Sequence, residues 1–160
     1  MIRRIAVTAP LRASPDEVGD AIGARGVSIF PEAVQVDEDA GFAVAEKVTV
    51  NVNRLAAHTW AVEISPVGHR RWLPAFDGRM TIARIVGDGV QLVLKGTYRP
   101  PLGWIGAVAD HVAGGRIARR SIGRFLHAAA VEIDREVRRQ RESRPMAVAP
   151  YPPDLRSRAR

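Results

Sequence analysis

The fold class is decided by residues 77–101, DGRMTIARIVGDGVQLVLKGTYRPP. Apolar side chains alternate with polar ones on both sides of Gly87-Asp88-Gly89, which is typical of two antiparallel strands. Because an Asp-Gly pair tolerates the positive φ of a tight turn, this segment predicts a β-hairpin of residues 77–86 and 90–99. The two prolines that follow cannot donate ladder hydrogen bonds, so they end the second strand.

The pattern changes to the helical period of 3.6 after Leu102. A helix over residues 116–141 would be about 39 Å long at roughly 1.5 Å per residue, which is enough to cross a whole sheet. Gly114-Gly115 precedes it and predicts a break or kink. The helix carries one long apolar stripe, made of Ala118, Ile122, Phe125, Leu126, Ala129, Ile133 and Val137.

Most of the chain before the hairpin has period two, interrupted by turn residues. Ser14-Pro15-Asp16-Glu17 predicts the start of a short helix, because Ser14 can cap it and the acids suit its positive end. We expect Gly23 and Gly26 to end that helix at about Ile22, with one further turn or short helix over residues 27–32. The predicted strands are residues 3–11, 34–37, 42–53, 57–65 and 69–73.

This element order predicts an α+β helix-grip fold, because a strongly curved sheet must bury one face and only the last helix can cover it. We expect a seven-stranded curved antiparallel sheet wrapped around a long C-terminal helix, with one or two short helices after the first strand. The domain would span residues 1–142. Residues 143–160 would form a flexible, basic, proline-containing tail.

The positive charge is concentrated near the C-terminus. The net charge is +7; residues 1–134 hold 16 Lys and Arg against 14 Asp and Glu, and residues 135–160 hold 8 against 3. A solvated helix end and a frayed terminus explain this excess better than a polyanion site, because Tyr151 is the one aromatic residue among the arginines. We therefore expect no specific nucleic-acid partner.

Composition excludes several classes of protein. The 160 residues contain no cysteine, which rules out disulfides, thiolate metal sites and a cysteine nucleophile. No stretch approaches the roughly 18 consecutive apolar residues of a membrane span, and no signal peptide is visible, so we expect a cytoplasmic protein without membrane insertion. The four histidines lack ligand spacing and no phosphate loop is present, so we expect no metal and no cofactor.

Three segments resemble a known superfamily: residues 13–18 (ASPDEV), 74–78 (PAFDG) and 96–103 (GTYRPPLG), followed by Gly106, Asp110 and Phe125-Leu126. The chain resembles, up to about Val137, the START-like or SRPBCC superfamily of polyketide cyclase/dehydrase and lipid-transport type, and in particular bacterial members that share the last signature. The resemblance implies the helix-grip architecture. Cyclases of the superfamily use pocket side chains that vary by subfamily, and no such set matches here residue by residue.

Polar residues on the predicted apolar strand faces are the candidates for a ligand cavity. Periodicity predicts that Glu46 and Arg84 face each other across the cavity, with His58 as a base near neutral pH. A strand bulge, or a strand end that reaches solvent, would place them elsewhere. Large aromatic residues could contact a ligand or fill a core. The full set of candidates is Glu46, His58, Trp60, Trp72, Phe76, Arg84 and Tyr98.

The leading hypothesis is a binding protein that encloses a hydrophobic or amphipathic small molecule, lipid-like or polyketide-like, between the curved sheet and the C-terminal helix. One alternative is a cyclase or dehydratase with an acid/base pair drawn from the cavity residues. Another is an interaction protein with a filled core that acts through its basic tail. A cavity of roughly 300 Å³ or more with inward polar groups would favour the first two.

Overall fold

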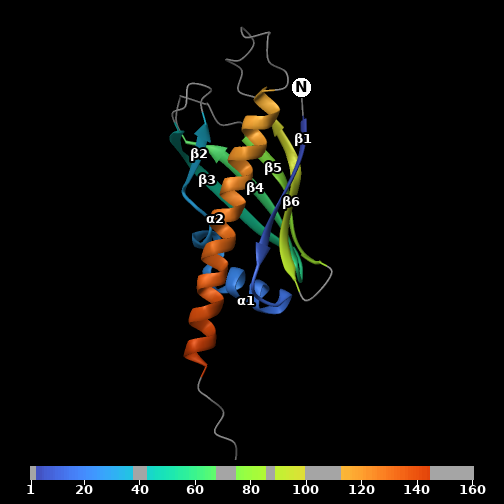
Figure 1. Ribbon diagram of the computed structural model, residues 1–160, viewed down its shortest axis with the longest axis vertical. Helices are drawn as coiled ribbons and strands as arrows, with labels where there is room; N and C mark the ends of the chain where they lie inside the picture. Colours follow the sequence, from blue (N-terminus) through green and yellow to red (C-terminus); the bar gives the residue numbers. More distant parts are fainter. Residues whose placement is uncertain (1–2, 38–42, 68–74, 86–88, 100–112, 145–160) are drawn as a thin grey trace, which may run out of the picture.

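The computed structural model of the protein describes residues 3–37, 43–67, 75–85, 89–99 and 113–144 (Figure 1). Within these ranges six strands form one sheet in the order β1-β6-β5-β4-β3-β2, and every neighbouring pair is antiparallel. The predicted α+β helix-grip fold is confirmed. The strands are β1 (Arg3–Leu11), β2 (Ala33–Asp37), β3 (Ala43–Ala56), β4 (Thr59–Pro66), β5 (Ala75–Arg84) and β6 (Val90–Arg99).

The seventh predicted strand, residues 69–73, lies outside the described residues. In the described part of the chain, β4 pairs directly with β5, with Ile64 opposite Phe76. The hairpin of β5 and β6 is confirmed, and Ile85 N donates to Gly89 O at 2.9 Å. Its first strand begins and ends two residues earlier than predicted, and turn residues 86–88 lie outside the described ranges.

The turn between β3 and β4 lies later than predicted. The sequence predicted that the first of these strands ends at Asn53, but β3 continues to Ala56 across a register shift between Arg54 and Ala56. The Arg54 guanidinium donates to the carbonyl oxygens of Ala56 at 3.3 Å and Ala57 at 3.2 Å. The Arg54 side chain thus bonds to the turn that follows its own strand, and the strand continues through Arg54 to Ala56.

The helix α1 (Pro15–Arg25) begins with the predicted cap. Ser14 Oγ accepts a hydrogen bond from Glu17 N, and the Glu17 carboxylate accepts one from Ser14 N, which forms a capping box. The predicted end at Ile22 is wrong, because the helix passes through Gly23 and stops at Gly26, whose φ is 55°. A short 3₁₀ helix, η1 (Gly26–Ile29), follows.

The long helix α2 (Ala113–Ser143) begins one residue before Gly114-Gly115, and the break expected there stays a prediction, because the preceding residues 100–112 lie outside the described ranges. The earlier part of the predicted helical region, residues 102–112, lies outside the described residues. All seven residues of the predicted apolar stripe are buried. Phe125 stacks on Phe30 with ring centroids 6.1 Å apart. Within the described ranges, neither α1 nor α2 has the length and apolar composition that a membrane-spanning helix needs.

The helix α2 closes the open side of the curled sheet. It packs against β1 and β2, which are the two edges of the sheet, and Figure 1 shows it running lengthwise between them. The side chains that alternate inward from the sheet therefore meet α2 in one core. Buried members of this core from the middle strands and β6 are Trp60, Val62, Ile64, Phe76, Met80, Leu92 and Leu94.

Two glycines opposite each other shape the sheet at one end. Gly78 of β5 pairs with Gly96 of β6, and the Phe76 ring lies over both of them. A Cβ at Gly78 would lie only 2.5 Å from the Lys95 carbonyl oxygen and 2.7 Å from the Phe76 ring. The sequence therefore uses glycine here to let two strands and an aromatic ring approach closely.

Candidate functional site

The strand register defines two ends of the concave face. At one end, Phe76 lies between Ile64 and Tyr98, and we call this the Tyr98 end. At the other, Val90 lies between Arg84 and Leu11, and we call this the Arg84 end. Phe76 and Arg84 are eight residues apart on β5, so the two ends are about 26 Å apart at roughly 3.3 Å per residue.

The Tyr98 end is sealed. Glu46, Phe76 and Tyr98 are all buried, with 8%, 1% and 4% of their surfaces exposed. Glu46 lies opposite Val34 of β2, on the same face as buried Val48, as the period-two pattern predicted. The burial of a carboxyl and a phenol among apolar neighbours makes this the polar part of the interior.

Among the described residues, the buried side chains in the middle of the concave face are apolar apart from one residue of α2. Trp60 lies opposite Met80, and both are buried. Ser121 of α2 is also buried, at 2% exposure, and sequence reasoning missed it. Its position could have been found from helical spacing, because it lies three residues after Ala118 and four before Phe125, on the same face of the helix as the apolar stripe. Trp72, another predicted cavity residue, lies outside the described residues.

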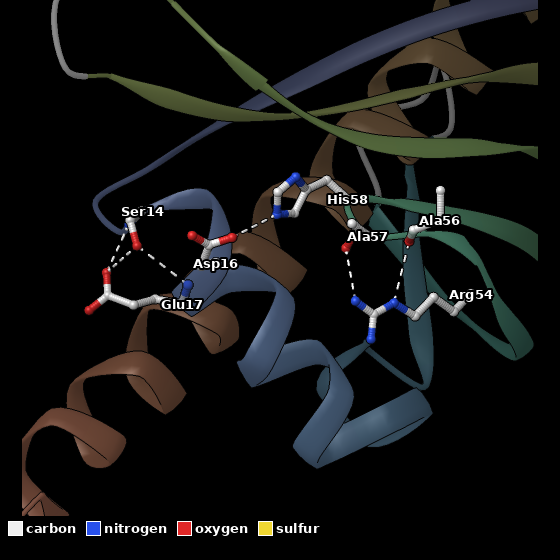
Figure 2. A network of polar contacts seen from close by, with 7 residues as sticks. All are labelled: Ser14, Asp16, Glu17, Arg54, Ala56, Ala57 and His58. Carbon is white, nitrogen blue, oxygen red and sulfur yellow. Dashed lines mark hydrogen bonds and ion pairs between the residues drawn. The ribbon is translucent and has the colours of Figure 1, made fainter.

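His58 lies in the turn between β3 and β4, so the prediction that it shares a strand face with Trp60 is wrong. Its Nε2 atom is 3.1 Å from Asp16 Oδ1 of α1, and its carbonyl oxygen accepts a hydrogen bond from Ile82 N at 3.1 Å. Figure 2 shows the imidazole pointing from the turn toward the first turn of α1. The arrangement holds the β3–β4 turn against the helix.

A groove of about 690 Å³ lies at the Arg84 end. Arg84 is on the inward register of β5 but is exposed, because it is the last residue of the strand. The prediction that Arg84 faces Glu46 is wrong, since the two residues lie at opposite ends of the sheet. The groove is lined by Leu11, Arg12, Ala13, Ser14, Pro15, Glu17, Arg84, Ile85, Gly89, Val90 and Arg141.

An ion pair joins two helices beside this groove. Arg141 of α2 donates to both carboxylate oxygens of Glu17 of α1, from Nε at 2.7 Å and from Nη2 at 2.8 Å. These hydrogen bonds, together with that from Ser14 N, lower the pKa of Glu17 to about 2. The carboxylate in turn raises the pKa of Arg141. The capping box predicted the place of Glu17, but no local signal could reveal a partner 124 residues away.

The structure does not gather the predicted acid and base residues into one site. Glu46 and Tyr98 belong to one end of the concave face, Arg84 belongs to the other, and His58 is bound to Asp16. No group of three or more histidine, aspartate or glutamate side chains in the described ranges could hold a metal ion. Of the predicted acid and base residues, Arg84 borders the groove, where guanidinium groups lie beside apolar side chains.

In fold, the chain is similar to solved structures of START-like, or SRPBCC, type. The di-domain aromatase/cyclase StfQ of the steffimycin biosynthetic pathway is similar with a TM-score of 0.53 and 7% identity, over 89% of this chain and 52% of that one. Ara h 8.0201 is similar with a TM-score of 0.53 and 11% identity, over 87% and 99% of the two chains. XoxI from Bacillus cereus is similar with a TM-score of 0.51 and 8% identity, over 86% of this chain and 97% of that one.

The resemblance to the START-like superfamily is thus confirmed at the level of fold. The chain spans about half the length of the di-domain aromatase/cyclase that it matches. No protein-family model matches the sequence, and no curated protein matches it either. Because the identities are so low, the likeness concerns the arrangement of helices and strands, and the site must be argued from this chain's own residues.

Proposed function

We propose that this protein binds a hydrophobic or amphipathic small molecule between the curved sheet and α2, with access through the groove at the Arg84 end. The START-like fold typically binds hydrophobic ligands in a cavity. The observation that carries the proposal for this chain is that two residues of the buried core, Leu11 and Val90, are among those that line the groove. The groove volume of about 690 Å³ is within the range of small-molecule sites.

The walls of the groove suit an apolar group. Ile85 lines the groove with 44% of its surface exposed, so it offers apolar surface that a ligand can cover. Ala13 and Pro15 add further apolar surface from the segment that leads into α1. A ligand that covers Ile85 and contacts Leu11 removes apolar surface from water, which contributes about 25 cal/mol per Å².

Binding is better supported than catalysis. A cyclase or dehydratase needs an acid and a base within reach of one substrate. Here Glu46 and Tyr98 are sealed at one end of the sheet, and Arg84 is about 26 Å away along β5. His58, the predicted base, is engaged with Asp16 outside the set of groove residues.

A binding assay with dodecanol, a neutral apolar probe, tests this proposal. We expect dodecanol to raise the melting temperature of the protein, and the variant Ile85→Asn to weaken that effect because it places an amide in the apolar wall. Val67→Asn is the matched control, because Val67 is also an exposed aliphatic residue, at 54%, but does not line the groove.

Two results would contradict the proposal. If no apolar probe from a broad panel of alcohols, lipids and polyketides raised the melting temperature, the alternative of a filled-core interaction protein would be favoured. If Ile85→Asn and Val67→Asn reduced dodecanol binding equally, the groove would not be the site.

A further inference from the structure

Positively charged side chains outnumber negatively charged ones among the residues that line the groove. The charged residues are Arg12, Arg84 and Arg141 on the positive side and Glu17 on the negative side. Glu17 is fully engaged by Arg141 through two hydrogen bonds. One arginine and one glutamate therefore neutralise each other, and two arginines remain beside the groove.

Neither remaining guanidinium has a carboxylate partner among the described residues. The ion pairs of this part of the chain include neither Arg12 nor Arg84. The Asp134 carboxylate accepts a hydrogen bond from the Arg12 backbone N–H at 3.1 Å, so it offsets part of this positive charge. Among the described residues, the three arginines at the groove then face two carboxylates, those of Glu17 and Asp134. The remaining excess of one positive charge favours an anion at this place.

The first turn of α1 also borders the groove, but its free N–H groups are not what would hold an anion. The side chain of Ser14 caps Glu17 N, and the Glu17 carboxylate covers Ser14 N. This capping box already places a negative charge at the positive end of the helix. An incoming anion would therefore be held by Arg12 and Arg84, whose planar guanidinium groups match the geometry of a carboxylate or phosphate.

The rest of the groove is apolar, and this composition indicates what the anion is attached to. Leu11 and Val90 lie on the same register row as Arg84, so the charged rim passes directly into the concave face. Ile85, next to Arg84 in the sequence, presents exposed aliphatic surface. A free inorganic anion would leave this surface in water, whereas an aliphatic chain would cover it.

We propose that the groove selects amphipathic anions: an oxyanion head, carboxylate or phosphate, binds Arg12 and Arg84, and the apolar tail lies against Leu11, Ile85 and Val90. This inference rests on the proposed function and names its ligand class. On binding, the anionic head exchanges hydrogen bonds to water for charge-assisted hydrogen bonds to the two arginines, and the apolar tail leaves water. No covalent bond forms or breaks.

Calorimetric titration with three probes tests the inference: dodecanoate, dodecanol and inorganic phosphate. We expect the intact chain to bind dodecanoate most tightly, dodecanol more weakly and phosphate without measurable heat. Arg84→Gln and Arg12→Gln should each weaken dodecanoate binding about tenfold and weaken dodecanol binding much less, because the alcohol head carries no charge for the guanidinium groups to bind. Arg79→Gln is the matched control, because Arg79 is an exposed arginine on the opposite face of β5.

The outcomes separate this inference from the proposed function. Equal affinities for dodecanoate and dodecanol, unchanged by the two variants, would overturn the inference and leave the proposed function standing. If phosphate bound as tightly as dodecanoate, and both variants lost that binding, the groove would be a site for free anions. That result would overturn the inference that its ligand is amphipathic. Failure of dodecanoate and dodecanol alike would overturn both proposals. Because Arg12 and Arg84 are exposed, both variants should fold, which urea unfolding checks.

Discussion

The two ends of the concave face share β5 and β6 and yet differ in burial and in charge. At the Tyr98 end, Phe76 lies over the paired glycines and only 1% of its surface is exposed. At the Arg84 end, the same face of β5 finishes in an exposed arginine beside a groove of about 690 Å³. The comparison teaches that the alternation of side chains along a strand determines which face of the sheet a residue lies on. How far the residue is from the end of its strand then determines whether it is buried or exposed.

The largest effect is expected from truncating one residue at each end. Phe76→Ala should lower the free energy of unfolding by about 3–5 kcal/mol, because it empties a fully buried site and uncovers two glycines. Arg84→Ala on the same strand should change it by no more than about 0.5 kcal/mol. Urea denaturation of the two variants measures both values. Similar losses would mean that the Arg84 end is as tightly packed as the Tyr98 end.

Smaller changes in stability, of opposite sign, are expected when two glycines are replaced by alanine. Gly96→Ala should destabilise the protein by about 1–3 kcal/mol, because its Cβ would overlap the Asp77 carbonyl oxygen and the Phe76 ring. Gly123→Ala should stabilise it by about 0.5–1 kcal/mol, since this helical position has only Val7 within 4.0 Å. Thermal unfolding checks both signs. Tolerance of Gly96→Ala would mean that the strands at the sealed end are not held that close.

The smallest effect concerns the ion pair beside the groove. The pKa of Glu17 is lowered from 4.5 to about 2, so its stabilising effect is complete above pH 4.5 and disappears as the pH falls through about 2. Arg141→Gln should therefore reduce stability at neutral pH, and its difference from the unchanged protein should shrink below pH 4.5.

Urea unfolding at several pH values follows this difference. Arg138→Gln, an exposed arginine of the same helix with no ion pair among the described residues, is the control and should show no such trend. A difference for Arg141→Gln that stayed constant down to pH 2 would rule out Glu17 as the group it stabilises.

Much of the fold could be predicted from the sequence because its signals are local. The alternation in residues 90–99 and the helical stripe around Phe125 each place their residues on the correct face. The errors come from effects that alternation does not encode. The Arg54 side chain prolongs β3 by binding carbonyl groups of the turn. The helix α1 ends at Gly26 and not at Gly23, because Gly26 adopts a positive φ of 55°.

The candidate site was harder to predict, because its residues meet only in three dimensions. Periodicity placed Glu46 and Arg84 on inward registers, but it could not show that they lie at opposite ends of the sheet. Arg12 follows a strand end and Arg141 belongs to a charged helix end, so neither stands out in a pattern. The partial exception is Glu17, whose capping role is local, although its pairing with Arg141 is not.

The positive excess after residue 134 was attributed to a solvated helix end and a tail, and the described part of it agrees with the first of these. Arg135, Arg139 and Arg141 lie on α2 with 63%, 54% and 53% of their side-chain surfaces exposed. They pair with Glu132, Glu136 and Glu17. The tail of residues 143–160 remains a prediction, because residues 145–160 lie outside the described ranges.

The central claim is that an amphipathic ligand enters at the Arg84 end, and methyl NMR with dodecanoate tests it most directly. Titration of the probe into protein labelled at Ile, Leu and Val methyl groups should shift the signals of Leu11, Ile85 and Val90, which line the groove. Signals of Val34 and Val48, near the Tyr98 end, should move least. Shifts concentrated at Val34 and Val48, with none at the groove, would contradict the account.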